Sequence, residues 1–270
     1  SNWIGAGGIS SDSPIYEQQR VAVSPSSFDS ARQCILRWFF ASNSGTSMPT
    51  QSAADGTLIH SLAERFPCGP RSAVMDALEE EIRAMGVDEG QAASKIHMDH
   101  LREMASALGE YLEQSTQMGS CADPNGNVQV EVPFDVPISS VHIRGRIDRM
   151  EVEGQGVRII DFKTGKRGNK TGAKKDPDHP QLALYQLAVE QLGYEVLGAE
   201  LKYLGYGDVR TISQDPLDPE TRADWISQLD EIGQKMKGPS FIATPSDEAC
   251  QYCEFARSCP AREQGKRSVE

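Results

Sequence analysis

Two short apolar runs, each ending in charged residues, constrain the fold of this chain more than any other feature of its sequence. In Val157–Lys163 (VRIIDFK), side chains two residues apart share a face, so Asp161 and Lys163 point the same way as Val157 and Ile159. Lysine and aspartate are rarely buried unless they are paired or bound to something. The run therefore predicts a strand that leaves an apolar core and ends at a site.

The preceding run, Val141–Arg149, has the same organisation. One of its faces is apolar, and the other face carries Asp148. The turn residues around Gly154–Gly156 predict that the two runs form a β-hairpin. Pairing of these strands brings Asp148 near Asp161.

Two neighbouring carboxylates have a chemical consequence. They repel each other, and the pKa of one rises, unless a cation lies between them. Mg²⁺ binds few protein carboxylates and fills its other positions with water and phosphate oxygens. With Lys163 nearby, the parts for phosphodiester hydrolysis are present: a metal-bound water as nucleophile and positive charge for the transition state.

Three spaced motifs carry a resemblance to a known family: Gly145–Asp148 (GRID), Asp161–Lys166 (DFKTGK) and Gln181–Gln186 (QLALYQ). The D-x-K pattern alone is more often a hairpin with surface carboxylates and a solvated lysine. Together, the motifs resemble the PD-(D/E)XK nuclease superfamily, specifically its RecB-like branch. The resemblance implies an α/β fold, with a restriction-endonuclease-like mixed β-sheet core flanked by helices, a helical insertion and a cysteine-ligated C-terminal end.

The same resemblance implies an activity, the metal-dependent hydrolysis of DNA phosphodiester bonds. Asp148 and Asp161 would hold Mg²⁺ or Mn²⁺, with the carbonyl oxygen of Phe162 as a further ligand. Lys163 would orient or acidify the attacking water.

Four more polar residues are expected at this site by the same likeness. His60 ends a G-T-x-x-H motif similar to the family's upstream helix, and would be a metal ligand or a phosphate contact. Gln181 and Tyr185, four residues apart on one helix face, would lie beside the metal-bound phosphate. Glu131 fits a family pattern of an acidic residue on the preceding strand. The ordinary alternatives are a structural histidine, a tyrosine half-buried in the core and a solvent-facing glutamate.

A cluster of cysteines near the C-terminus is the second strong signal. Cys250, Cys253 and Cys259 lie within ten residues, and soft thiolates select zinc or iron–sulfur clusters. Zinc would need a fourth ligand, for which Cys34 is the natural candidate. One upstream cysteine plus three near the end also resembles the iron–sulfur RecB-like nucleases, which implies a [4Fe–4S] cluster that ties the two ends together. Zinc and free thiols remain the alternatives.

Cysteine usage also bears on the cellular compartment. Six cysteines without a secretory signal favour a reducing, cytoplasmic compartment and argue against a disulfide framework. Cys68 and Cys121 have no partner at metal-ligand spacing, and no disulfide is expected between them. No apolar run approaches transmembrane length, so no membrane partner is expected.

The distribution of charge favours a local nucleic-acid groove. The net charge of −12 argues against a broadly basic binder, yet residues 144–175 hold ten Lys/Arg against four Asp/Glu. A solvated loop is an equally good explanation for residues 166–175. The residues expected to contact DNA are Arg146, Lys166, Arg167, Lys170, Lys174 and Lys175.

Periodicity predicts the remaining elements. Strands are expected at residues 21–23, 128–136, 195–205 and 209–212. A helix capped by Ser24 is expected to run through Phe40 with Cys34 inside it. The other expected helices are residues 53–66, 71–85, 91–117 and 219–236, and one that begins at Pro180.

The domain expectation is a tail at residues 1–20 followed by one RecB-like nuclease domain at 21–270, with a helical insertion at about 70–120 and a cluster-binding segment at 250–260 plus Cys34. The GxxxxGK[ST] spacing of an ATPase motor is absent, and the chain does not begin with Met. The family implies an exonuclease-type DNA end-processing role, often beside a helicase module in the same polypeptide or complex. The alternatives are an idle DNA-binding scaffold, against which the intact Asp148, Asp161 and Lys163 argue, and a stand-alone exonuclease of the CRISPR-associated type.

Overall fold

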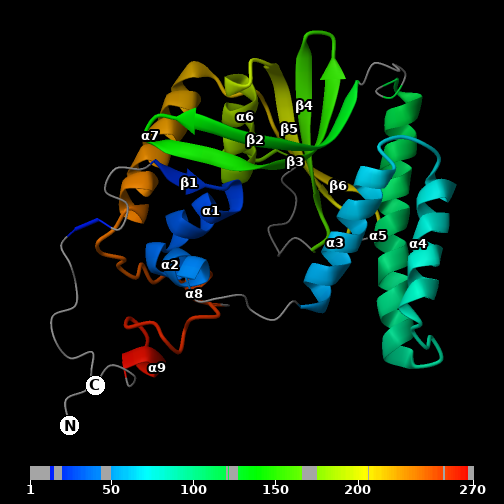
Figure 1. Ribbon diagram of the computed structural model, residues 1–270, viewed down its shortest axis with the longest axis horizontal. Helices are drawn as coiled ribbons and strands as arrows, with labels where there is room; N and C mark the ends of the chain where they lie inside the picture. The colour runs from blue at the N-terminus through cyan, green and yellow to red at the C-terminus, as the bar shows by residue number, and fades with distance from the viewer. Residues whose placement is uncertain are drawn as a thin grey trace. The chain divides into compact units, whose positions relative to one another are not determined.

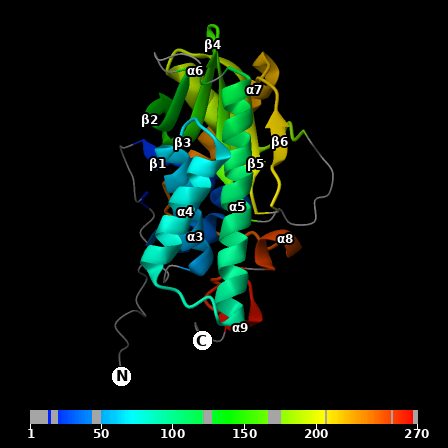
Figure 2. The ribbon, with the colours of Figure 1, turned by 90° about the vertical axis from the view of Figure 1, so that its right-hand side faces the viewer.

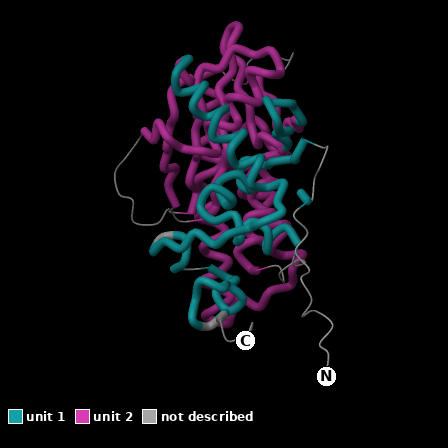
Figure 3. Tube along the Cα trace, turned by 90° about the vertical axis from the view of Figure 1, so that its left-hand side faces the viewer, with its two compact units in different colours: residues 1–46, 135–144, 219–270 teal, residues 47–134, 145–218 magenta. Residues whose placement is uncertain are grey.

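The structure of the chain is a computed structural model that describes residues 13–14, 20–43, 50–119, 121, 127–165, 175–205, 207–251 and 253–266. Most of the expected tail at residues 1–20 lies outside these ranges. The chain divides into two compact units, each built from segments far apart in the sequence (Figure 3). Unit 1 comprises residues 1–46, 135–144 and 219–270, and unit 2 comprises residues 47–134 and 145–218.

A mixed β-sheet forms the centre of unit 2 (Figure 1). Strand β3 (Val141–Glu153) pairs antiparallel with β4 (Gly156–Lys163), and β4 pairs parallel with β5 (Glu195–Tyr203). Strand β5 pairs antiparallel with β6 (Arg210–Gln214), and β2 (Val128–Ile138) pairs with β3. The β3–β4 turn contains Gly154 in a left-handed conformation (φ 65°), which confirms the predicted hairpin.

Helices cover both faces of this sheet. Ile160 and Phe162 of β4 share an apolar core with α3 (Gln51–Arg65), α4 (Arg71–Met85) and α5 (Ala92–Gln117), which pack side by side (Figures 1 and 2). Asp161, which points to the opposite face of β4, contacts helix α6 (Pro180–Gln191). This arrangement confirms the α/β class and the predicted order of elements.

Unit 1 contains the short strand β1 (Val21–Val23), which pairs parallel with the beginning of β3. Its helices are α1 (Pro25–Gln33), α2 (Ile35–Asn43), α7 (Pro219–Met236), α8 (Asp247–Cys250) and α9 (Glu263–Lys266). Ser24 caps α1 in a capping box, as its sequence predicts. None of the helices in the described part of the chain is long and apolar enough to cross a membrane.

The single helix expected through Phe40 is wrong, because the structure divides it at Cys34. Cys34 takes an extended conformation (φ −162°, ψ 111°) between α1 and α2. Its amide donates to the carbonyl of Ser30, and its own carbonyl accepts from the amide of Trp38. The backbone groups at the break are therefore satisfied, so a second helix can begin directly after the cysteine.

The expectation that Cys68 and Cys121 have no disulfide is also wrong. These two residues are 53 apart in the sequence and form a disulfide. Cys68 follows α3 and Cys121 follows α5, and these two helices pack against each other in the same direction because α4 runs back between them. Their C-terminal ends therefore meet, which spacing along the chain does not reveal.

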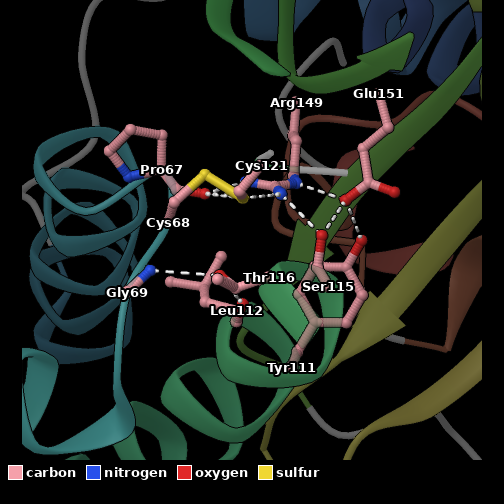
Figure 4. The surroundings of a disulfide bond; sticks show 10 residues. All are labelled: Pro67, Cys68, Gly69, Tyr111, Leu112, Ser115, Thr116, Cys121, Arg149 and Glu151. Carbon is pink, nitrogen blue, oxygen red and sulfur yellow. Dashed lines mark hydrogen bonds and ion pairs between the residues drawn. A yellow bond between two sulfur atoms is a disulfide. The ribbon is translucent and has the colours of Figure 1, made fainter. Parts of the chain in front are cut away.

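A buried ion pair lies beside this disulfide (Figure 4). Arg149 is 1% exposed and Glu151 is 6% exposed, and the guanidinium donates to Glu151 Oε1 at 2.7 Å. The hydroxyls of Tyr111 and Ser115 donate to the same oxygen at 2.9 and 2.7 Å. Burial alone would raise the pKa of Glu151, but the charge of Arg149 and these hydrogen bonds lower it overall.

Replacing Arg149 with leucine should lower the free energy of unfolding by about 3–5 kcal/mol, because it leaves the Glu151 carboxylate buried without its cation. Urea unfolding of the two proteins measures this difference. The double variant Arg149→Leu/Glu151→Leu should recover most of the loss, since no unpaired charge then remains. Equal destabilisation in the single and double variants would contradict this account.

Candidate metal centre and cysteine cavity

The β3–β4 hairpin brings the two predicted carboxylates together. Arg149 pairs with Ile160, so Asp148 and Asp161 are the next residues on the two strands. Asp148 Oδ2 accepts the backbone N–H of Phe162 at 2.7 Å, and the negative charge of Asp148 acts directly on Asp161. Their side chains are 14% and 5% exposed, so both charges lie where water screens them poorly.

Asp161 is surrounded by donors on one side. Its Oδ1 accepts from Gln181 Nε2 and from the Tyr185 hydroxyl, each at 2.9 Å. Its buried Oδ2 lies 2.6 Å from the Lys163 ammonium but accepts no well-aligned hydrogen bond from any described residue. Burial raises the pKa of Asp161; the charge of Lys163 opposes this rise without cancelling it, and Asp148 adds to it. Asp161 Oδ2 therefore already lies beside one cationic group, the Lys163 ammonium.

His60 and Glu131 lie on the other side of Asp148. His60 Nδ1, on α3, is 3.4 Å from Asp148 Oδ2. One ligand atom from each of His60, Glu131 and Asp148 lies within 4.8 Å of the others, the only such group among the described residues. Glu131 has a positive φ of 50°, a strained conformation of the kind found at functional sites. These three side chains line an open groove of about 530 Å³.

The histidine responds to both carboxylates. Burial alone would lower the pKa of His60, but the hydrogen bond and charge of Asp148, with the charge of Asp161, raise it overall. The imidazole therefore retains its proton to a higher pH than an ordinary histidine, and a metal ion would compete with that proton.

Two glycines of the sequence motifs have a steric explanation. A methyl group on Gly145 would lie 2.8 Å from the ring of Phe134, and this ring packs edge-on against Tyr185 with centroids 6.0 Å apart. A methyl group on Gly56 would lie 3.2 Å from Thr164 Oγ1, which lines the groove. Sequence reasoning missed Phe134 and Thr164 as neighbours of the site; their signal is that each must lie against a motif glycine.

The expected DNA-contacting residues are only partly described. Arg146 donates to Glu131 Oε2 at 3.3 Å, so it lies at the edge of the metal centre. Lys175 is exposed and pairs with Asp215 at 2.7 Å. The other four residues lie outside the described part of the chain: Lys166, Arg167, Lys170 and Lys174.

The four cysteines predicted to act together line one cavity in unit 1. Cys34, Cys250, Cys253 and Cys259 are free thiols, and Arg37 and Arg262 lie in the same lining. Burial alone would raise the pKa of the Cys34 thiol, but hydrogen bonds from Thr244 and from backbone groups near Cys34 lower it overall. The four sulfur donors thus face a common space, although they come from opposite ends of the chain.

The spacing of these sulfurs bears on what they could hold. Four thiolates around one tetrahedral zinc, with bonds of about 2.3 Å, would lie roughly 3.8 Å apart. No three of the four sulfurs lie within 4.8 Å of one another, since His60, Glu131 and Asp148 form the only such group among the described residues. The four sulfurs are therefore not gathered at the spacing of ligands around one zinc ion.

Comparison with known proteins places the chain in a family. Residues 22–260 match the family model of the PD-(D/E)XK nuclease superfamily. The chain belongs to this superfamily. The superfamily consists of metal-dependent nucleases, and His60, Glu131 and Asp148 form a group that could hold a metal ion.

More specific relatives cover only part of the chain. The Gene 69 protein of Mycobacterium phage L5 is 26% identical over 152 residues, which are 54% of this chain and 49% of that protein. The Gene 69 protein of Mycobacterium phage D29 is 25% identical over 142 residues, 51% of this chain and 49% of that protein. The chain thus spans about half the length of these curated relatives. The crystal structure of SSO0001 overlaps 91% of this chain and 88% of that chain, with 14% identity and a TM-score of 0.41.

The raised pKa of His60 predicts how metal binding depends on pH. Below that pKa the imidazolium cannot be a ligand, so the affinity for Mn²⁺ should rise with pH and level off above it. Titration of the protein with Mn²⁺ followed by electron paramagnetic resonance, between pH 5.5 and 8.5, measures this profile.

Two histidine variants control this measurement. His60→Gln should weaken binding and remove most of the pH dependence. His97→Gln, which changes a histidine that pairs with Asp55 on α3 at 2.8 Å, should retain the profile. An unchanged profile in His60→Gln would show that another group controls metal binding.

Proposed function

We propose that this chain is a Mg²⁺- or Mn²⁺-dependent deoxyribonuclease that hydrolyses phosphodiester bonds at DNA ends. The observation that supports it most is the pair Asp148 and Asp161, held together by the hairpin, with the Lys163 ammonium 2.6 Å from Asp161 Oδ2. Carboxylates and a histidine that line one groove, with Asp161 and the Lys163 ammonium beside Asp148, suit phosphate chemistry better than a purely structural role.

Each residue has a specific role in this proposal. Asp148 and Asp161 hold the divalent ion, and His60 and the carbonyl oxygen of Phe162 are further ligands. Glu131 is a further possible ligand, because its carboxylate oxygen lies within 4.8 Å of those of His60 and Asp148. The bound ion supplies the means to lower the pKa of a water nucleophile and to neutralise phosphate charge.

The remaining side chains position the water and Asp161 and stabilise the transition state. Lys163 orients the attacking water and places positive charge where the phosphate becomes more negative in the transition state. Gln181 and Tyr185 hold Asp161 through its Oδ1. Burial, followed by the charge of Asp161, raises the pKa of Tyr185, so its hydroxyl stays protonated and remains a donor.

DNA is the proposed partner. The excess of basic residues at 144–175 supports it, with Arg146, Lys175 and the four basic residues outside the described ranges as backbone contacts. The resemblance to RecB-like nucleases further suggests end processing in recombination or repair beside a helicase module. A stand-alone exonuclease of the CRISPR-associated type is the second candidate, because it shares the cysteine arrangement.

We also propose that Cys34, Cys250, Cys253 and Cys259 bind a [4Fe–4S] cluster. The shared cavity, the free thiols and the resemblance of the cysteine arrangement to the iron–sulfur RecB-like nucleases support this proposal. The cluster would be structural, because it links residue 34 to the segment 250–259 and so closes a very long loop.

Asp148→Asn should reduce the hydrolysis of linear DNA by at least about 100-fold, because it removes one of the two charges that hold the ion. Release of nucleotides from end-labelled DNA in Mg²⁺ or Mn²⁺ measures this loss. Asp178→Asn is the matched control, since Asp178 is exposed and outside the groove. If the unmodified protein binds DNA but never cleaves it with either metal, the chain is an idle scaffold and the proposal fails.

Protein purified without oxygen should absorb broadly in the visible range and contain about four iron and four sulfide per chain. Cys34→Ser should reduce both, because one ligand is lost. The control Cys68→Ser/Cys121→Ser should keep the colour and the iron, since these cysteines belong to the disulfide in unit 2. A colourless protein loaded with zinc would refute the cluster and leave the nuclease proposal intact.

A further inference from the structure

The disulfide Cys68–Cys121 joins the segments that follow helices α3 and α5, next to Arg149 of strand β3 (Figure 4). Cys68 is three residues beyond α3, the helix that carries His60. Cys121 is four residues beyond α5. Both cysteines are half-buried, so a small reductant can reach them.

Arg149 connects the disulfide to the strand that carries Asp148. Its guanidinium donates to the carbonyl of Pro67, next to Cys68, and to Ser115 Oγ at 2.9 Å near the end of α5. Asp148 directly precedes Arg149 on β3. The segment after α3 is therefore held to both α5 and β3 at one place.

Other contacts of this segment include Phe66, which packs against the apolar core. The amide of Gly69 donates to Thr116 Oγ1 at 3.2 Å, and Phe66 closes α3 through the carbonyl of Leu62. Helix α3 itself stays folded through the buried side chains Ile59 and Leu62. Opening the disulfide would therefore free the end of α3 from α5 and β3, so that the folded helix can shift relative to β3.

We propose that Cys68 and Cys121 are a thiol–disulfide pair whose redox state sets how tightly the metal centre binds its divalent ion. The inference rests on the proposed function, because it requires His60 and Asp148 to be ligands. With the disulfide closed, the end of α3, which carries His60, is fixed to α5 and, through Arg149, to β3, which carries Asp148. With it open, His60 samples more positions, and ion binding must restrict it again.

The surroundings favour exchange at this bond. Arg149 Nη2 lies 3.9 Å from Cys121 Sγ, and a nearby guanidinium stabilises a thiolate. A dithiol reductant attacks Cys68 Sγ as a thiolate, and Cys121 leaves as the thiolate beside Arg149. The second thiol of the reductant then displaces Cys68. The protein gains two electrons and, after protonation, two thiols, while the dithiol becomes a cyclic disulfide.

The test compares one protein in two redox states. One sample of the full chain is treated with reduced dithiothreitol and the other with oxidised dithiothreitol, without oxygen, and the reagent is removed before Mn²⁺ is added. Electron paramagnetic resonance should show a dissociation constant for Mn²⁺ about tenfold larger in the reduced sample, the size of effect typical of groups that support metal ligands. Alkylation followed by mass spectrometry identifies Cys68 and Cys121 as the residues that change state.

A variant and a second measurement complete the design. Cys68→Ser/Cys121→Ser should bind Mn²⁺ as weakly as the reduced protein after either treatment. Amide hydrogen exchange at residues 60–69 should be faster in the reduced unmodified protein, which does not depend on the folding of any variant. Equal affinity in the two states, or a pair that oxidised dithiothreitol cannot close, overturns this inference alone. Failure to bind Mn²⁺ in either state overturns the proposed function, and this inference with it.

Discussion

The register between β3 and β4 controls the metal centre. The turn at Gly154 pairs Arg149 with Ile160, and Asp148 and Asp161 follow as neighbours. A slip of one residue would send a carboxylate to the opposite face of the sheet. In the native register the Asp161 carboxyl is buried and its pKa is raised. The charge of the Lys163 ammonium opposes this rise only in part. A cation between the two carboxylates would relieve the repulsion that contributes to this rise.

Because side chains alternate along β4, its two faces contact different helices. Ile160 and Phe162 fill the core formed with α3, α4 and α5, while Asp161 faces α6. The apolar residues therefore fix the strand on the helix that carries His60. On the other face, Gly145 makes room for the Phe134 ring, which packs on Tyr185. Core packing and the positions of the polar groups thus depend on the same few residues of two strands.

Most of the fold follows from local patterns. Two apolar runs joined by turn residues predicted the β3–β4 hairpin, and the helix expected at residues 71–85 ends at Met85, before Gly86 in a left-handed conformation. The family motifs grouped Asp148, Asp161, Lys163, Gln181 and Tyr185, and the structure brings Asp161 into contact with Lys163, Gln181 and Tyr185. The break at Cys34 was missed because the residues on both sides favour helix. The Arg149–Glu151 pair could have been found, since both residues continue the inward-facing period of Ile147.

The six cysteines show why counting alone could not assign their chemistry. An even number of cysteines is compatible with three disulfides, with metal ligation or with both. The structure separates two sets: the disulfide pair lies within unit 2, and the four free thiols lie within unit 1. The pair became visible only through the parallel packing of α3 and α5, a tertiary feature without a sequence signal. Because one set is a closed bond and the other consists of free thiols that line a cavity, a reductant acts on the first set, whereas the second set is already in the form that binds metal.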